Sequence, residues 1–243
     1  MTVAGSLKRG LVAGVCAGIL AALFAFLVAE RTVDRAIAFE DQRRAAAHAT
    51  ADQADGSADP VSRDVQRRVG GPTGFVLAGA AIGAIFGLVY AALRRLTDER
   101  DPWQRSLFLA ATAVSALVVV PFLRYPPNPP GVGDPDSLDA RTRYYLASLL
   151  LGLSVVVGAW RLLRYLRARG WPQSQRQPLT AVLVVAVLGL GFLALPTPPD
   201  QVLIPAKLLW DFRIQSLATQ LLLWSSLAAV FGLLSERAAR ARA

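Results

Sequence analysis

The stretch GLVAGVCAGILAALFAFLVA, residues 10–29, decides the fold class of this chain. It holds no charged residue, and a helix needs roughly 20 apolar residues to cross the hydrocarbon core of a bilayer. Gly10, Gly14 and Gly18 recur every four residues, which places them on one face of a helix. Such a face lets a second helix approach closely in lipid. The stretch therefore predicts a retained membrane-spanning helix with a tight packing face.

Five more apolar runs of similar length follow, at residues 75–93, 107–123, 144–163, 179–195 and 214–234. The first of these runs repeats the glycine spacing at Gly79, Gly83 and Gly87, so we expect the first two spans to pack together. The sequence predicts an all-α polytopic membrane protein, a bundle of six transmembrane helices that forms a single domain over residues 1–243. Two halves of three spans each would permit an inverted repeat.

The net charge of +9 reflects membrane topology rather than a nucleic-acid partner. With a cytoplasmic N-terminus, the inside segments hold 14 basic and four acidic residues, and the outside segments hold 12 and 13. This excess follows the positive-inside rule. Its strongest element is WRLLRYLRARGW, residues 160–171, which has four arginines and no acid. We expect both termini in the cytoplasm and a multi-pass protein of the cytoplasmic membrane.

The outward segment between the first two spans, residues 30–73, is strongly charged. Its start predicts a charged helix that continues the first span and carries Glu30 and Asp34 on one face. Its middle, rich in alanine, aspartate and glycine, predicts a mobile stretch. Its end, VSRDVQRRVGGP, predicts a short helix that stops at the Gly-Gly-Pro sequence.

The connection PFLRYPPNPPGVGDPDSLDARTR, residues 121–143, holds six of the 15 prolines. Each proline fixes φ and removes a donor, so residues 125–130 must form a rigid polyproline-II segment. In one interpretation this rigid outward loop, residues 124–140, presents oxygen ligands of Asn128, Asp134 and Asp136 to a divalent cation. In the other it is a stiff turn, with Asp136 or Ser137 capping the next helix.

Polar residues mark the outer ends of two later spans. Asp211, Gln215 and Thr219 repeat every four residues, which makes a polar stripe that lipid would penalise. We expect the stripe to face the bundle or water, either as part of an outward vestibule or through ordinary interhelical hydrogen bonds. The residues assigned to a transport pathway are Tyr125, Arg141, Tyr145, Asp211, Arg213, Gln215, Thr219 and Gln220.

Standard catalytic signatures are absent from the sequence. It contains no GxSxG, HExxH, Walker A or CxxC motif, and His48 is its only histidine, which excludes a histidine-based zinc site or triad. We expect no enzyme and no tightly bound cofactor. A membrane enzyme that acts on a lipid at the arginine-rich inner rim remains an alternative. It predicts a lipid-sized pocket beside Arg161, Arg164 and Arg167.

Four patches, in the expected order, resemble the CbtA family of predicted cobalt transporter subunits: AERTVDRAIAFED, VSRDVQRRVGG, VPFLRYPPNPPGVGDPDSLDARTRYYL and IPAKLLWDFRIQSLATQLLLW. The resemblance implies an inner-membrane protein linked to cobalt uptake for corrinoid synthesis. It also implies a small single-span, histidine-bearing partner protein, CbtB. Members often carry a histidine-rich run in the first outside loop, where this chain has only His48.

The resulting prediction is a subunit of a membrane transporter for a divalent metal ion, with cobalt(II) as the transported ion. The alternative is a non-transporting scaffold that docks a partner, favoured by the glycine faces and the rigid loop. Expected partners are membrane lipids, a CbtB-like subunit and a second copy of the chain. The candidate metal ligands at an outer capture site are Asn128, Asp134, Asp136, Glu30, Asp34 and His48.

Overall fold

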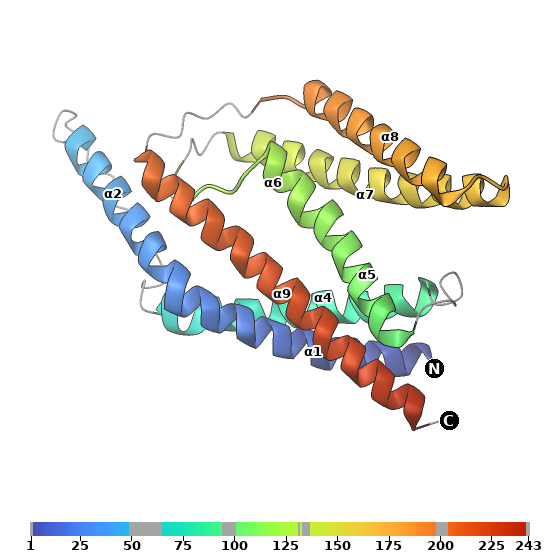
Figure 1. Ribbon diagram of the computed structural model, residues 1–243. Helices are drawn as coiled ribbons and strands as arrows, with labels where there is room; N and C mark the ends of the chain where they lie inside the picture. Colours follow the sequence, from blue (N-terminus) through green and yellow to red (C-terminus); the bar gives the residue numbers. More distant parts are fainter. Residues whose placement is uncertain are drawn as a thin grey trace. The chain divides into compact units, whose positions relative to one another are not determined.

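The computed structural model describes residues 2–48, 65–93, 101–130, 132, 137–197 and 204–241. Across these residues the chain is helical and contains no strand (Figure 1). Six helices are long and apolar enough to cross a membrane: Val3–Arg43, Arg67–Leu93, Pro102–Arg124, Leu138–Ala168, Gln173–Ala194 and Ala206–Arg240. They cover the six predicted runs to within one residue, so the all-α, six-span prediction is confirmed.

Three of these spans contain a π-helical segment. The first span consists of α1 (Val3–Phe24) and η1 (Ala25–Ala29), and the same long helix continues as α2 (Glu30–His48). The second consists of η2 (Gln66–Gly70) and α4 (Gly71–Leu93). The third consists of α5 (Pro102–Val114), η4 (Ser115–Val119) and α6 (Val120–Arg124). The last three are α7 (Leu138–Ala168), α8 (Gln173–Ala194) and α9 (Ala206–Arg240).

The predicted charged helix after the first span is α2, but the predicted stop at Gly-Gly-Pro is wrong. Helix η2 passes into α4 through Gly70, Gly71 and Pro72 without a break. A proline removes one helical N–H and crowds the carbonyl four residues earlier. The wider π-helical turn that precedes Pro72 relieves this crowding.

The helices group into two compact units. Unit 1 comprises Met1–Ala111, Asn128–Val132 and Leu203–Ala243, and thus the first, second and sixth spans and the start of the third. Unit 2 comprises Thr112–Pro127 and Gly133–Val202, and thus the rest of the third span, the fourth and the fifth. The units do not coincide with the two halves of the sequence, and an inverted repeat stays a prediction. A single functional domain stays a prediction.

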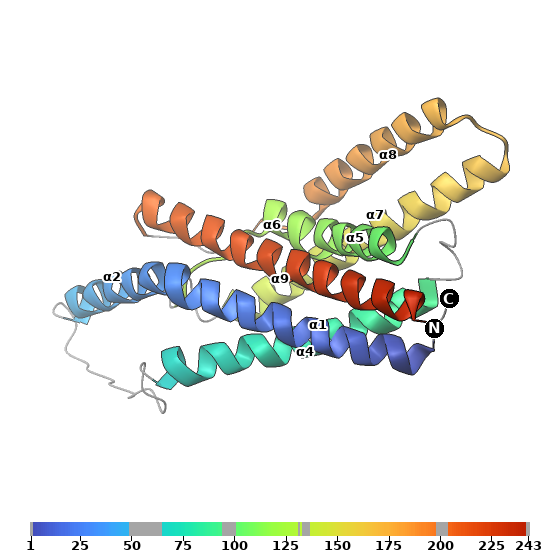
Figure 2. The ribbon, with the colours of Figure 1, turned by 60° about the horizontal axis from the view of Figure 1, so that its bottom comes forward.

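Unit 1 is built on direct contact between the two glycine faces, which run antiparallel (Figure 2). A Cβ added at Gly14 would meet the carbonyl oxygen of Gly79 and lie 2.9 Å from the Cα of Gly83. A Cβ at Gly10 would meet the carbonyl oxygen of Gly83 and lie 3.1 Å from the Cα of Gly87. The backbones of α1 and α4 therefore touch, and the predicted packing of the first two spans is confirmed.

Helix α9 completes unit 1 through an aromatic core. The Phe231 ring lies 4.7 Å from the Tyr90 ring and 5.2 Å from the Phe86 ring, both edge-on. The guanidinium of buried Arg105 lies 5.6 Å from the Tyr90 ring centre. Ser106 at the start of α5 donates a 2.7 Å hydrogen bond to the Ala228 carbonyl of α9. These contacts hold the sixth span beside the first two.

Unit 2 contains the antiparallel hairpin of α7 and α8 (Figures 1 and 2). Gly152 of α7 lies against the Ala116 backbone of η4, and Gly191 of α8 lies against the Leu151 side chain. Helix α7 starts with Ser137 at the N-cap, but the side chain of Ser137 makes no capping hydrogen bond, contrary to one of the two predicted caps. The other, Asp136, lies outside the described residues.

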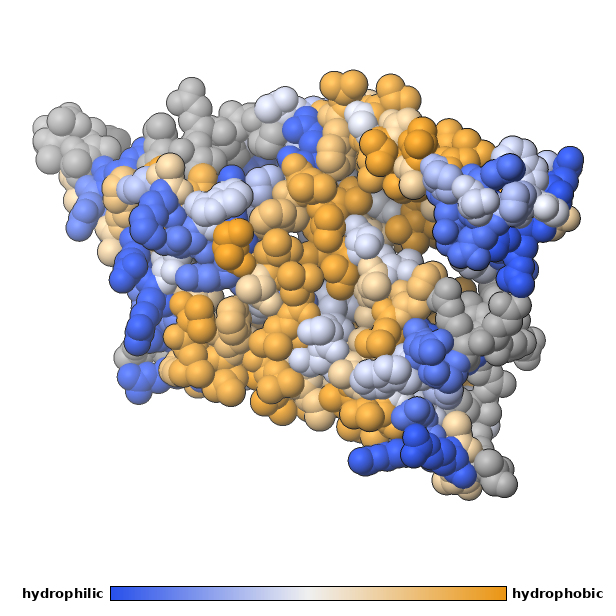
Figure 3. Space-filling model, in the orientation of Figure 1, coloured by the Kyte–Doolittle hydropathy of each residue, from blue (hydrophilic) through white to orange (hydrophobic). Residues whose placement is uncertain are grey.

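Side-chain polarity agrees with membrane-spanning helices. On the face shown in Figure 3, hydrophobic side chains cover the middle parts of the helices and hydrophilic ones gather at the helix ends. Such a distribution keeps charged groups out of the hydrocarbon. The protein is a multi-pass membrane protein.

Candidate functional site

The second half of the proline loop is attached to α9 within unit 1. Arg213 of α9 donates a 3.1 Å hydrogen bond from Nη2 to Oδ1 of Asn128. The loop then buries Pro129 and Val132, and the Val132 N–H bonds the Pro129 carbonyl at 3.3 Å. Oδ1 of Asn128, the predicted metal ligand, is thus already in contact with the Arg213 guanidinium. A metal ion at Asn128 would have to displace Arg213.

The first half of the loop is attached to the end of α8 within unit 2. Arg124 donates from Nη2 to the carbonyls of Leu195 and Pro196, and the Tyr125 hydroxyl donates a 2.7 Å bond to Pro196. The Tyr125 ring lies 5.0 Å from the Arg124 guanidinium and stacks on Tyr144 at 6.2 Å. Arg124 therefore satisfies carbonyls that the end of α8 leaves free, and places a positive charge where the helix dipole favours it.

The polar stripe of α9 is buried at Thr219 and at the Gln215 amide oxygen and is partly exposed at Asp211. Thr219 is only 7% exposed and donates a 2.8 Å bond to the Gln215 carbonyl. Oε1 of Gln215 is buried and has no hydrogen-bond donor among the described residues. Asp211, nearer the helix start, pairs with Lys207 at 2.8 Å. Gln220, which was assigned to the same pathway, is exposed.

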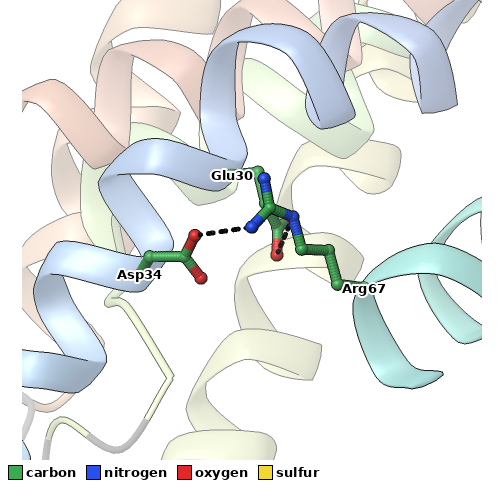
Figure 4. A network of polar contacts seen from close by, with 3 residues as sticks. All are labelled: Glu30, Asp34 and Arg67. Atoms are coloured by element: carbon green, nitrogen blue, oxygen red, sulfur yellow. Dashed lines mark hydrogen bonds and ion pairs between the residues drawn. The ribbon is translucent and has the colours of Figure 1, made fainter. Parts of the chain in front are cut away.

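Glu30 and Asp34 of α2 come together on one cation (Figure 4). Arg67 of η2 lies between them, with Nη1 3.3 Å from Oδ2 of Asp34 and Nε 3.9 Å from Oε1 of Glu30. Its guanidinium also lies 5.6 Å from the ring centre of Phe26 in η1. The predicted shared face of the two acids is confirmed. Arg67 is therefore the group with which a metal ion would compete there.

The remaining metal candidates do not join this pair in the described structure. His48 is the last residue of α2, and a helix carries it about 27 Å from Glu30 at 1.5 Å per residue. Asp134 and Asp136 lie outside the described residues. In the part of the chain that the structure covers, no group of three or more His, Cys, Asp or Glu residues could hold an ion.

The pathway residues of the fourth span belong to unit 2. Tyr145 is 43% exposed, Arg141 is half-buried, and buried Ser148 donates a 2.7 Å bond to the Tyr145 carbonyl. Because α9 belongs to unit 1, a vestibule that Arg141 and Tyr145 share with the α9 stripe stays a prediction.

Comparison with known families decides what kind of protein this is. The chain matches the profile of a family described as "Probable cobalt transporter subunit (CbtA)" over residues 5–236. The chain belongs to the CbtA family. No curated protein and no solved structure matches it. The predicted family is thus confirmed. Because the family is described as a transporter subunit, the protein is expected to have partner subunits.

Three arginines of this CbtA-family chain carry contacts that sequence reasoning missed. The sequence patterns assign Arg67 and Arg124 no role, and they place Arg213 in a transport pathway rather than beside the loop. A role for Arg124 could have been predicted, since it follows an apolar run and closely precedes the proline-rich residues 125–130. The role of Arg67 could not have been predicted, because its partners lie more than 30 residues earlier in the chain.

Tyr125→Phe should destabilise this CbtA-family protein by about 1 kcal/mol, because the hydrogen bond from the Tyr125 hydroxyl to the Pro196 carbonyl is lost, although Arg124 still donates to that carbonyl. Burial raises the pKa of the Tyr125 phenol above 10.0, the nearby Arg124 charge lowers it in part, and Tyr144 raises it. A raised pKa in the folded state means that the stabilisation is complete below pH 10 and is lost as the pH rises through that pKa.

Thermal unfolding of detergent-solubilised protein between pH 8 and 11 measures this effect. The wild-type advantage over Tyr125→Phe should shrink above pH 10, whereas Tyr145→Phe, which alters an exposed ring on α7, should show no such trend. A constant difference between wild type and Tyr125→Phe at all pH values would argue against the hydroxyl as the relevant donor.

Proposed function

We propose that this chain takes up cobalt(II) across the cytoplasmic membrane, as the multi-pass subunit of a transporter whose second subunit is a small single-span CbtB-like protein. The family match over residues 5–236 is the observation that supports this most strongly. The proposed orientation puts both termini and the 160–171 arginines in the cytoplasm, in line with the positive-inside rule. The proline loop and α2 then lie outside.

Uptake would follow the buried stripe of α9. A cation in the bilayer needs ligands at every step, since even one charge at the centre costs roughly 2.5–3.5 kcal/mol on insertion scales. The Gln215 amide oxygen is buried and lacks a donor among the described residues, and an unpaired buried oxygen costs about 1–3 kcal/mol. A passing cation would satisfy that oxygen.

The outer capture step would use the loop and the first outside segment. Asn128, Asp134, Asp136, Glu30 and Asp34 offer oxygen donors, while cobalt(II) also favours imidazole. This chain has one histidine, His48. We therefore assign the nitrogen ligands to the CbtB-like partner, and we assign Arg67 and Arg213 the role of cations that a captured metal displaces.

The scaffold alternative loses one of its two motivations. The glycine faces of α1 and α4 are in contact with each other, so they are not surfaces for a partner. The rigid loop, attached at Arg124 and Asn128, remains compatible with docking. The transporter and the scaffold differ in whether the protein carries metal ions across the membrane.

Gln215→Leu should lower the uptake of radiolabelled cobalt about tenfold in a cobalt-starved host that also expresses the partner, because a leucine offers the ion no ligand. Ser225→Ala is the matched control, since the exposed Ser225 hydroxyl only bonds carbonyls of its own helix. Gln220→Leu distinguishes a path along the buried side of α9 from one along its exposed side. Full uptake in both Gln215→Leu and Asp134→Ala, with equal protein levels, would favour the scaffold.

A further inference from the structure

We propose that the groove between α7 and α8 binds one acyl chain of an anionic phospholipid, with the phosphate at the connection between the two helices. This site lies within unit 2 and does not rest on the proposed transport function. Three observations support it: the shape and lining of the groove, its length, and the charges at one of its ends.

The groove is apolar and of ligand size. It encloses about 310 Å³, at the lower end of the roughly 300–1,000 Å³ range of ligand pockets. Its ten lining residues carry no charge, and the hydroxyl of Thr180 is bonded to the Arg176 carbonyl of its own helix. Gly158 opens the groove, because a Cβ added there would meet no atom within 4 Å.

The length of the groove matches one leaflet. Along α7 it extends from Leu151 to Leu162, about 17 Å at a rise of 1.5 Å per residue. The hydrocarbon core of a bilayer is about 30 Å thick, so the groove covers about half of it. One end therefore lies near the middle of the membrane and the other near its surface, at the α7–α8 connection.

The surface end of the groove is cationic. Arg169 lies seven residues after Leu162, and Arg176 lies four residues before Thr180, so both continue the groove-lining faces of their helices. Residues 160–176 hold five arginines and no acid. Figure 3 shows this end of the hairpin as a hydrophilic group next to hydrophobic helices.

The backbone adds to the attraction. Helix α8 begins after Pro172, which has no capping side chain, so the positive end of the helix dipole and its first N–H groups point to the same place. Arg169 rests on the Tyr165 ring at 5.0 Å and Trp171 is exposed, as expected of residues at the headgroup level. Basic pockets between transmembrane helices are known sites for acidic headgroups.

Electron paramagnetic resonance with spin-labelled phosphatidylglycerol and phosphatidylcholine tests the headgroup. In bilayers that contain the wild-type protein, phosphatidylglycerol should associate more strongly than phosphatidylcholine. Arg169→Gln with Arg176→Gln should reduce this preference about fivefold for each arginine. Arg164→Gln with Arg237→Gln removes the same charge elsewhere and should leave the preference intact. Equal association of the two lipids with wild type would overturn the proposal.

Gly158→Leu tests the acyl chain, because a Cβ at residue 158 meets no atom within 4 Å and the rest of the leucine side chain would occupy space in the groove. It should remove one immobilised lipid per protein. Gly189→Leu is the matched control, since Gly189 also has open space around it but does not line the groove. If inorganic phosphate alone displaced the lipid, the site would be an anion site only, and the proposal that the groove binds an acyl chain would be overturned. A Gly158→Leu variant that changes the oligomeric state but not the lipid count would overturn it as well, since a second copy would then occupy the groove.

Discussion

Gly83→Ala should destabilise the protein by about 3 kcal/mol or more, the upper range of overpacking effects, and should sharply reduce its yield. The new Cβ would meet the carbonyl oxygen of Gly10 and lie 2.6 Å from the Cα of Gly14. Both atoms belong to the backbone of α1, so no side-chain rotation can relieve the clash. The two helices would have to separate, and contacts along their whole interface would weaken.

Gly74→Ala, on the same helix, is the matched control. A Cβ at Gly74 would meet no atom within 4 Å, and alanine favours the helix over glycine by about 1 kcal/mol. Thermal unfolding in detergent, together with the yield of monodisperse protein, compares the two variants. If Gly83→Ala unfolded at the wild-type temperature, the close contact of α1 and α4 would be refuted.

Arg213→Gln should lower cobalt uptake about tenfold while leaving the six spans folded. The bond from Arg213 to Asn128 connects the proline loop to α9, and a hydrogen bond to a charged group contributes about 1.5–3 kcal/mol. Without it, the loop loses this attachment to the helix that carries the polar stripe, and we expect the lost positioning of the loop to outweigh the removal of a cation that competes with the metal for Asn128. Asn128→Ala removes the same bond from the other side and should have a similar effect.

A double-mutant cycle separates this bond from other roles of the two residues. The double variant should be about as impaired as either single variant, because one interaction is removed in all three. Arg240→Gln serves as the control, since it removes an exposed charge from the other end of the same helix. Additive losses in uptake would show that Arg213 and Asn128 act separately, for example as independent groups along the path.

Local patterns predicted much of this protein. The apolar length of each run predicted six spans, and the four-residue spacing of Gly10, Gly14 and Gly18 predicted which face of α1 packs. The prolines after Arg124 predicted where the third span ends. The period of α9 predicted that Gln215 and Thr219 share a face. The sequence also indicated a capture site at Asp134 and Asp136, which stays a prediction.

Long-range polar contacts could not be predicted. Arg67 contacts two acids of α2, and Arg124 contacts carbonyls 71 and 72 residues later. A long, flexible side chain can reach any acceptor that the fold places near it. The residues next to it in the sequence do not predict which acceptor that is. The Gly-Gly-Pro stop failed for a different, local reason, because a π-helical turn directly before Pro72 accommodated a proline that usually ends a helix.

The sequence alone determined the membrane class, the number of spans and the face on which two of them meet, because length, charge and period act locally along the chain. Only the tertiary structure decided that the first, second and sixth spans form one unit while the fourth and fifth belong to the other. The physical reason is that lipid is as apolar as most helix surfaces. The choice of partner then depends on shape and on a few polar bonds, and these exist only once the helices are placed together.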